Sequence, residues 1–249
     1  MRRVLYWILK YILLGPLLRL LYRPQVTGLE HVPAEGPAIF ALNHNTFMDS
    51  IFLPLMVKRH VTFLAKDEYF TTPGIKGFFM KIFFTGVGQV GIDRSGGSAS
   101  EAALRTGVRV LGEGELLGIY PEGTRSPTGK LYRGHTGVAR MALAAHCVVI
   151  PVGMRGTREV QPPGRMIPKV KKIAFSIGKP LDFSRYEGMD EDRFVLRSMT
   201  DEIMYEIMQL SGQEYVDTYA AKAKKQLRDA ANGGAEQIKE PEPEAAATA

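Results

Sequence analysis

Cysteine is almost absent from this sequence: Cys147 is the only one among 249 residues. A disulfide within the chain is therefore excluded, and with it the class of small secreted domains that depend on disulfides for stability. Cys147 lies in the apolar run HCVVIPV, where we expect a small buried side chain and not a nucleophile. The chain is predicted to work in a reducing compartment.

Histidine is also scarce, with five residues scattered along the chain. These histidines do not show the spacing that is typical of zinc or other metal ligands. No metal site is therefore predicted from the sequence.

A long uninterrupted apolar run is missing as well. The most hydrophobic segment, residues 1–23, is interrupted by Lys10, Pro16 and Arg19, whereas a spanning helix needs about 20 consecutive apolar residues. No small-residue cleavage site of a signal peptide follows it, and Pro16 is expected to kink or break the helix. We favour a membrane-interfacial helical segment, with basic side chains at lipid phosphates and Trp7 at headgroup depth. A spanning or re-entrant helix and a helix docked on the protein's own core remain alternatives.

The net charge of +6 is concentrated in this segment. Five basic residues and one acidic residue among residues 1–30 account for +4 of it. These charges stand among leucine, isoleucine, tryptophan and tyrosine, so a membrane surface with anionic lipids is the predicted partner, in preference to nucleic acid. The predicted location is the cytoplasmic face of the cell membrane, peripheral or monotopic.

After residue 24 the sequence alternates between short apolar runs and helical patterns. The predicted strands are 36–43, 60–66, 86–93, 116–123, 147–154 and 172–178. The predicted helices are 46–58, 75–83, 99–113, 135–145 and 191–210. Several strands are continuously apolar, as expected when helices cover both faces of a sheet. The predicted fold class is α/β, with a mixed, largely parallel sheet flanked by helices.

This pattern predicts three parts of the chain. An interfacial helical segment, 1–23, precedes one globular domain, 24–219. The last part, 220–249, is a charged tail rich in alanine, lysine and glutamate. We expect this tail to begin as a helix and to end disordered, and we assign it no chemistry.

The stretch NHNTFMD, residues 43–49, leaves the first predicted strand and carries His44 and Asp49. A histidine and an aspartate are two members of a charge-relay triad, but no serine or cysteine is placed to complete it. Neighbours on a helix are three or four residues apart, so a spacing of five is poor for contact on a regular helix. The pair meets only if His44 lies on the turn before the helix and Asp49 inside it. The alternative is a loop histidine followed by an aspartate that is favoured by the helix dipole.

The stretch YPEGTRS, residues 120–126, forms a polar turn after another predicted strand. Arg125 can donate two N–H groups to a phosphate, and Gly123 allows backbone amides to approach a ligand closely. Thr124 offers a hydroxyl. The alternative is an ordinary turn in which Glu122 and Arg125 form a surface ion pair.

The stretch GQVGIDR, residues 88–94, is a predicted strand that ends near Arg94. Ligands of open α/β sheets bind outside the carboxyl ends of the strands. Because His44, Arg94 and Arg125 each follow a predicted strand, we expect them to face one cleft. Two arginines and a histidine suit a phosphate-bearing molecule whose hydroxyl is to be deprotonated.

These three stretches, together with VVIPVGM at 148–154, resemble in order and spacing the four motif blocks of the glycerolipid acyltransferases. The resemblance is to the bacterial lysophosphatidic acid acyltransferases and covers roughly residues 35–180. It implies transfer of a fatty acyl group from acyl-CoA or acyl-carrier protein to the free hydroxyl of a lysophospholipid, most simply lysophosphatidic acid. It implies no cofactor beyond the acyl donor.

The resemblance also implies roles for individual residues. His44 is the expected general base, and Asp49 is its orienting partner. Arg133 stands where relatives often carry a lysine, which keeps the charge but changes its geometry. The residues expected at the acceptor are Arg94, Glu122, Gly123, Thr124, Arg125 and Arg133.

Three other functions are left open by the motifs. The acceptor can be another lysolipid. The protein can be a membrane-associated thioesterase-type hydrolase in which His44 activates water, or it can be a non-enzymatic membrane-surface binding protein.

Residues 74–88, rich in phenylalanine, are a candidate acyl groove or lipid contact, or else part of the core. Residues 155–172 are a candidate site for anionic headgroups, or else a solvated loop.

Overall fold

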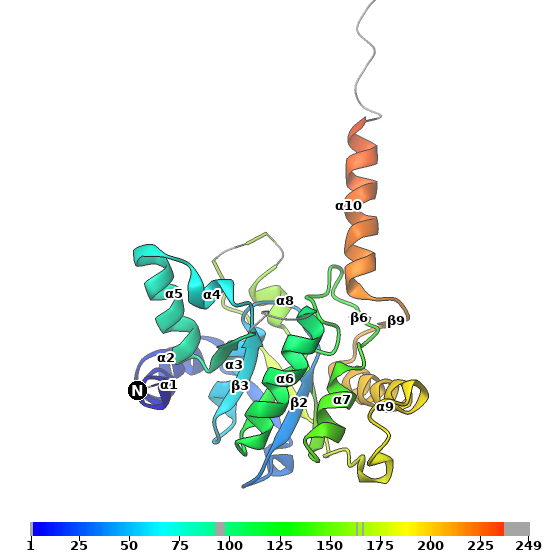
Figure 1. Ribbon diagram of the computed structural model, residues 1–249. Helices are drawn as coiled ribbons and strands as arrows, with labels where there is room; N and C mark the ends of the chain where they lie inside the picture. Colours follow the sequence, from blue (N-terminus) through cyan, green and yellow to red (C-terminus); the bar gives the residue numbers. More distant parts are fainter. Residues whose placement is uncertain (1, 93–97, 163, 166, 237–249) are drawn as a thin grey trace, which may run out of the picture.

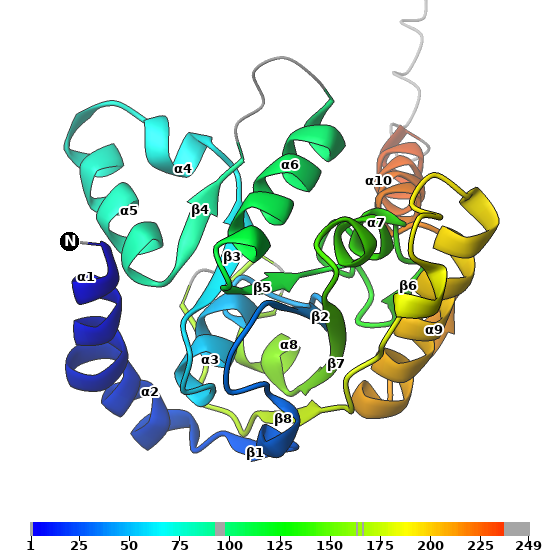
Figure 2. The same cartoon turned by 60° about the horizontal axis from the view of Figure 1, so that its bottom comes forward.

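A seven-stranded sheet forms the centre of the protein. The computed structural model describes residues 2–92, 98–162, 164–165 and 167–236. The strand order is β1-β8-β7-β2-β5-β3-β4 (Figure 1 and Figure 2, with all seven strands labelled in Figure 2). All described pairs in it are parallel except β7 with β8. The strands are β1 (Gln25–Thr27), β2 (Ala38–Leu42), β3 (Val61–Ala65), β4 (Gln89–Gly91), β5 (Leu116–Ile119), β7 (Val148–Arg155) and β8 (Ala174–Ile177). The predicted mixed, largely parallel sheet is therefore confirmed.

Helices cover both faces of this sheet, and a core lies on each face. Phe40 of β2 packs toward α3 and the N-terminal helices, whereas its neighbours Ile39 and Ala41 pack toward α6, α7 and α9. This is why the run AIFAL is apolar at every position. The helices are α1 (Arg2–Ile8), α2 (Leu14–Tyr22), α3 (Asp49–Met56), α4 (Glu68–Thr71), α5 (Gly74–Gly86), α6 (Ala99–Gly112), α7 (Gly137–Ala144), α8 (Thr157–Val160), α9 (Arg193–Ser211) and α10 (Ala220–Glu236).

Each predicted strand and helix is present, and short elements were missed. β1 is three residues long and pairs with β8, about 150 positions away. β6 (Leu131–Tyr132) and β9 (Tyr215–Val216) form a separate two-stranded ribbon, next to which α10 projects from the body (Figure 1). Elements this short carry no periodicity, so only their distant partners define them.

The N-terminal segment is one continuous helical stretch. α1 and α2 are joined by a π-helical turn, η1 (Leu9–Leu13), in which the N–H of Leu14 donates to the carbonyl of Leu9. Pro16 lies in the first turn of α2, where a missing N–H is tolerated. The chain stays helical at Pro16, so of the predicted kink or break the break is wrong, and the irregularity takes the form of the π turn that precedes the proline.

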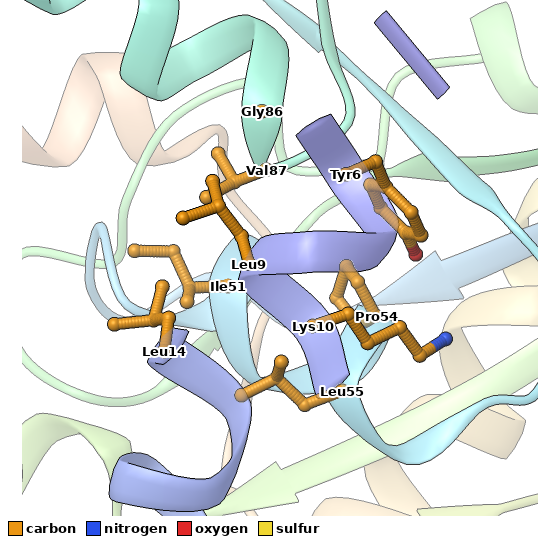
Figure 3. A pocket seen from close by; sticks show the side chains of 9 residues that line it. All are labelled: Tyr6, Leu9, Lys10, Leu14, Ile51, Pro54, Leu55, Gly86 and Val87. Carbon is orange, nitrogen blue, oxygen red and sulfur yellow. The ribbon is translucent and has the colours of Figure 1, made fainter. Parts of the chain in front are cut away.

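One side of this segment packs on the protein's own core. Tyr6, Leu18 and Tyr22 are buried, and α1 lies beside α5 (Figure 2). Figure 3 shows Leu9 and Lys10 of the turn η1 beside α3, at a crevice lined mainly by apolar side chains. The docked alternative is thus correct for this side of the segment.

Lys10 and Arg19 do not extend outward as lipid-phosphate contacts would require. Lys10 is 2% exposed, and its Nζ donates to the carbonyl of Val57 and, at 3.4 Å, to that of Arg59. Arg19 donates to the carbonyl of Leu55. The carbonyls of Leu55 and Val57 lie at the C-terminal end of α3, where the last turn has no helical donors of its own and favours positive charge. The expectation is therefore wrong for Lys10, whereas Arg19 is bonded at the same helix end but stays exposed.

The other side of the segment remains apolar and exposed. Among the described residues, Arg3–Tyr22 is the helical stretch long and apolar enough to cross a membrane, with a mean hydropathy of 1.6. Only 22% of its most apolar part is buried in the protein. Length and hydropathy alone therefore permit membrane association without deciding between spanning and lying in the interface.

Candidate active site

The candidate site forms where β2 and β5 end side by side. These strands are parallel neighbours, with Ala41 opposite Ile119, so the loops that follow them meet at one edge of the sheet. The backbone N–H of His44 donates to Glu122 Oε2 at 2.9 Å. The N–H of Ser126 donates to the His44 carbonyl at 2.7 Å. The two predicted motifs are thus joined directly.

His44 and Asp49 are hydrogen-bonded. His44 Nδ1 lies 3.0 Å from Asp49 Oδ2, with His44 on the turn and Asp49 as the first residue of α3. The same oxygen accepts the backbone N–H groups of Asn45 and Thr46 at 2.7 and 2.8 Å, and Oδ1 accepts the Thr46 hydroxyl at 3.1 Å. An ionised carboxylate is only an acceptor, so Nδ1 carries the proton and Nε2 is free to accept one.

Tyr120 lies flat against the imidazole of His44. The ring centroids are 3.8 Å apart and the rings are inclined by 12°. Burial, together with the negative charge of Asp49, raises the pKa of the Tyr120 hydroxyl well above its ordinary value. Tyr120 is therefore a neutral wall that fixes the plane of the imidazole. Sequence reasoning missed it, although it is the first residue of the YPEGTRS block.

Glu122 is buried, and both of its oxygens have backbone partners. It is 1% exposed, and its two oxygens accept the backbone N–H groups of His44 and Tyr132, both at 2.9 Å. Burial raises the pKa of Glu122 to about 7, against the lowering effect of these two hydrogen bonds. Glu122 therefore ties the His44 turn to strand β6, and its contact with the acceptor stays a prediction.

The loop from Gly123 to Ser126 is a tight turn that presents the side chain of Arg125. Gly123 has a φ of +70°, a conformation in which residues with a Cβ are strained. Arg158 fixes the end of the loop by donating to the carbonyls of Ser126 and Pro127 at 3.2 and 3.0 Å. Arg125 is exposed at the tip of the loop. Its guanidinium is therefore accessible to a ligand.

The two other predicted acceptor residues have different outcomes. Arg133 Nη1 lies 3.2 Å from Asp217 Oδ1, and its guanidinium carbon lies 5.8 Å from the ring centroid of Tyr219. Arg133 thus has an acidic partner from the C-terminal part of the chain. Arg94 lies outside the described residues.

A buried amide network supports the His44 turn from behind. Asn43 Nδ2 donates to the Met154 carbonyl at 2.9 Å, and Asn43 Oδ1 accepts the Met154 N–H at 2.8 Å. Gln213 Oε1 accepts from Asn43 at 2.7 Å, while Gln213 Nε2 donates to Asn45 Oδ1 and to the Gly129 carbonyl. These amides hold the turn between β7 and the segment after α9. Isolated amides in a sequence carry no signal of such a network.

Comparison with known proteins identifies a family for this chain. A family model described as acyltransferase matches residues 23–155, more than half of the chain. A 1-acyl-sn-glycerol-3-phosphate acyltransferase of Bacillus subtilis is 28% identical over 194 residues, which are 76% of this chain and 88% of that protein. A chloroplastic 1-acyl-sn-glycerol-3-phosphate acyltransferase of Arabidopsis thaliana is 29% identical over 57% of this chain. This chain spans about two fifths of that plant protein's length, 39%.

A solved structure has the same fold. The crystal structure of the 1-acyl-sn-glycerophosphate acyltransferase of Thermotoga maritima superposes with a TM-score of 0.59 and 25% identity, and the match covers 83% of this chain and 81% of that one. The resemblance inferred from the four motif blocks is therefore confirmed, and this chain belongs to the acyltransferase family.

Proposed function

We propose that this protein transfers a fatty acyl group from acyl-CoA or acyl-carrier protein to the free hydroxyl of lysophosphatidic acid, giving phosphatidic acid. The observation that carries this proposal is the placement of His44 Nε2. His44 Nδ1 is hydrogen-bonded to the buried carboxylate of Asp49, which leaves Nε2 to act as the base. The imidazole stands beside the loop that carries Arg125. A base without a nucleophile of its own suits a substrate that brings the nucleophile.

In this scheme the acceptor hydroxyl loses its proton to His44 Nε2 as its oxygen attacks the thioester carbonyl of the donor. The carbon–sulfur bond then breaks, and the leaving thiolate takes the proton back from the imidazolium. Asp49 stabilises the imidazolium and keeps Nδ1 protonated. No residue of the protein is acylated.

The acceptor phosphate is assigned to the loop at Gly123, Thr124 and Arg125. Arg125 supplies charge and a forked donor, and Thr124 supplies a hydroxyl. Arg94 and Arg133 remain proposed members of the same site. Glu122 is assigned to positioning, since both of its oxygens are already engaged by backbone amides.

The test is acyl transfer by the purified protein. Lysolipids with different headgroups are offered with acyl-CoA or acyl-carrier protein, and the products are identified by mass spectrometry. Phosphatidic acid should form from lysophosphatidic acid, and donor turnover should depend on added acceptor. Donor hydrolysis at the same rate without acceptor would support a thioesterase instead, and turnover of a different lysolipid alone would change the acceptor.

We further propose that the protein lies in the cytoplasmic membrane interface through an apolar face on the N-terminal segment and α5. The exposed apolar side chains of this face are Val4, Ile8, Ile12, Leu13, Leu17, Leu20, Leu21, Ile75, Phe78, Phe79 and Ile82. Two adjoining elements contribute to it (Figure 2), and contiguous apolar surface of this kind is typical of membrane contact. We also propose that the exposed lysines Lys169, Lys171 and Lys172 contact anionic headgroups. The exposed apolar side chains of Ile167 and Val170 lie in the same stretch.

Replacing Leu13, Leu17 and Leu20 together with serine should weaken binding to anionic vesicles about 100-fold. The three side chains are 59%, 52% and 68% exposed, so the fold loses little, while each loses roughly 1 kcal/mol of apolar contact with lipid. Vesicle co-sedimentation measures the effect. Phe194→Ser is the matched control, because Phe194 is 88% exposed but lies on α9, on the other face of the sheet. Equal binding by the triple variant and the control would remove the proposed face.

A further inference from the structure

Lys224 of α10 reaches back to the loop that carries Thr124 and Arg125. Its Nζ donates to Thr124 Oγ1 at 2.6 Å, although the two residues are 100 positions apart. Lys224 is partly buried, whereas Lys222 and Lys225 on the same helix are exposed. The C-terminal helix, to which the sequence assigned no chemistry, therefore contributes a cation to the candidate active site.

The start of α10 is built into the protein, so this contact is held by packing. Ala220 and Ala223 are buried against Tyr132 of β6, the strand whose amide is bonded to Glu122. The ring of Tyr219 stacks on His135 with centroids 4.5 Å apart. The ribbon of β6 and β9 joins the same two parts of the chain. The position of Lys224 thus follows from the fold.

The charges around Lys224 point to an anionic ligand. Burial and the nearby positive charge of Arg125 lower the pKa of Lys224, and Glu122 opposes this effect. Both oxygens of Glu122 are engaged by backbone amides. Among the described residues Lys224 forms no ion pair. In contrast, Lys130, which follows the loop of Thr124 and Arg125, pairs with Glu214 at 2.7 Å. Two cations close together without a paired carboxylate are stabilised when an anion binds between them.

We propose that Lys224 binds the acceptor phosphate together with Arg125 and Thr124, and that this second cation makes the site prefer a phosphate monoester to a phosphodiester headgroup. The inference rests on the acyl transfer proposed above. A monoester carries about −1.5 to −2 charges near neutral pH and three terminal oxygens. A diester carries about −1 and gains less from a second cation.

Lys224→Gln is the decisive variant, because glutamine retains a donor for Thr124 but loses the charge. KM for lysophosphatidic acid should rise roughly tenfold, the size expected for losing one charge-assisted contact, with kcat changed less than about twofold. Lys224→Arg should remain near the parent, and Lys222→Gln and Lys225→Gln, on the same helix, should not change KM. If the glutamine variant keeps the parent KM, or if the arginine variant loses as much as the glutamine variant, Lys224 is only a tether and the proposal is wrong.

A binding measurement separates this proposal from the proposed function. sn-Glycerol 3-phosphate, the headgroup alone, should raise the Tm of the parent protein and raise that of Lys224→Gln much less, whereas glycerophosphocholine should raise neither. If the parent fails to acylate lysophosphatidic acid, the proposed function fails. If the parent acylates it and sn-glycerol 3-phosphate stabilises both proteins equally, only the assignment of Lys224 fails.

Discussion

His44→Ala should lower kcat for acyl transfer by about 10²- to 10⁴-fold, the range of a positioned general base. The variant leaves the acceptor hydroxyl without a group to take its proton. Tyr120 does not replace the histidine, because burial and the charge of Asp49 raise the pKa of its hydroxyl, which therefore stays protonated. KM for lysophosphatidic acid should change little, because the phosphate loop does not depend on the imidazole. Release of CoA thiol, followed with a colour reagent, measures the rate.

The fold should survive this substitution. Asp49 keeps its hydrogen bonds from Asn45 and from the backbone and hydroxyl of Thr46, so the turn remains closed, and Glu122 still accepts the backbone N–H of residue 44. A Tm within a few degrees of the parent is the control. Acyl transfer at the parent rate by a folded His44→Ala protein would falsify the proposed mechanism.

The hydrogen-bonded pair of His44 and Asp49 was accessible from the sequence because it is local. His44 and Asp49 belong to one strand-to-helix turn. The spacing of apolar residues and the turn-forming residues between the apolar runs locate such turns in a sequence. The convergence of this turn with Thr124 and Arg125 also followed, since both come after buried parallel strands and such strands end at one edge of a sheet. Patterning of apolar residues was therefore sufficient for the sheet, the large helices and the outline of the site.

What the sequence did not indicate depends on contacts between distant residues. A glutamate in the turn that carries Arg125 suggests a ligand contact, and nothing in the sequence indicates that its two oxygens accept the backbone amides of His44 and Tyr132. A lysine in an apolar N-terminal helix suggests a contact with lipid phosphates, yet the Val57 carbonyl at the end of α3 binds Lys10. The approach of Lys224 depends on β6 and β9, two-residue strands that carry no pattern of their own.

Asp49→Asn should lower kcat by about 10²- to 10⁴-fold while leaving the fold nearly intact. The amide oxygen of asparagine can replace Oδ2, which accepts from His44 Nδ1, Asn45 and Thr46, and its NH₂ group can donate to the Thr46 hydroxyl in place of Oδ1. The turn and the tautomer are then kept, but the negative charge that stabilises the imidazolium is lost. In the Ser-His-Asp triad, the corresponding change costs about 10⁴ in kcat through the wrong tautomer, so about 10⁴ is the upper limit expected here.

Asp49→Ala separates the structural part of this residue from the chemical part. Alanine leaves the backbone donors of Asn45 and Thr46 without partners at a position that is 0% exposed, and each buried unsatisfied group costs about 1–3 kcal/mol. We therefore expect urea unfolding to show a loss on the order of 3 kcal/mol for Asp49→Ala and less than about 1 kcal/mol for Asp49→Asn. If Asp49→Asn kept the parent kcat, the carboxylate would only close the turn. If both variants were equally unstable, the loss of activity would result from unfolding. It would then not support an electrostatic role for Asp49 in the reaction.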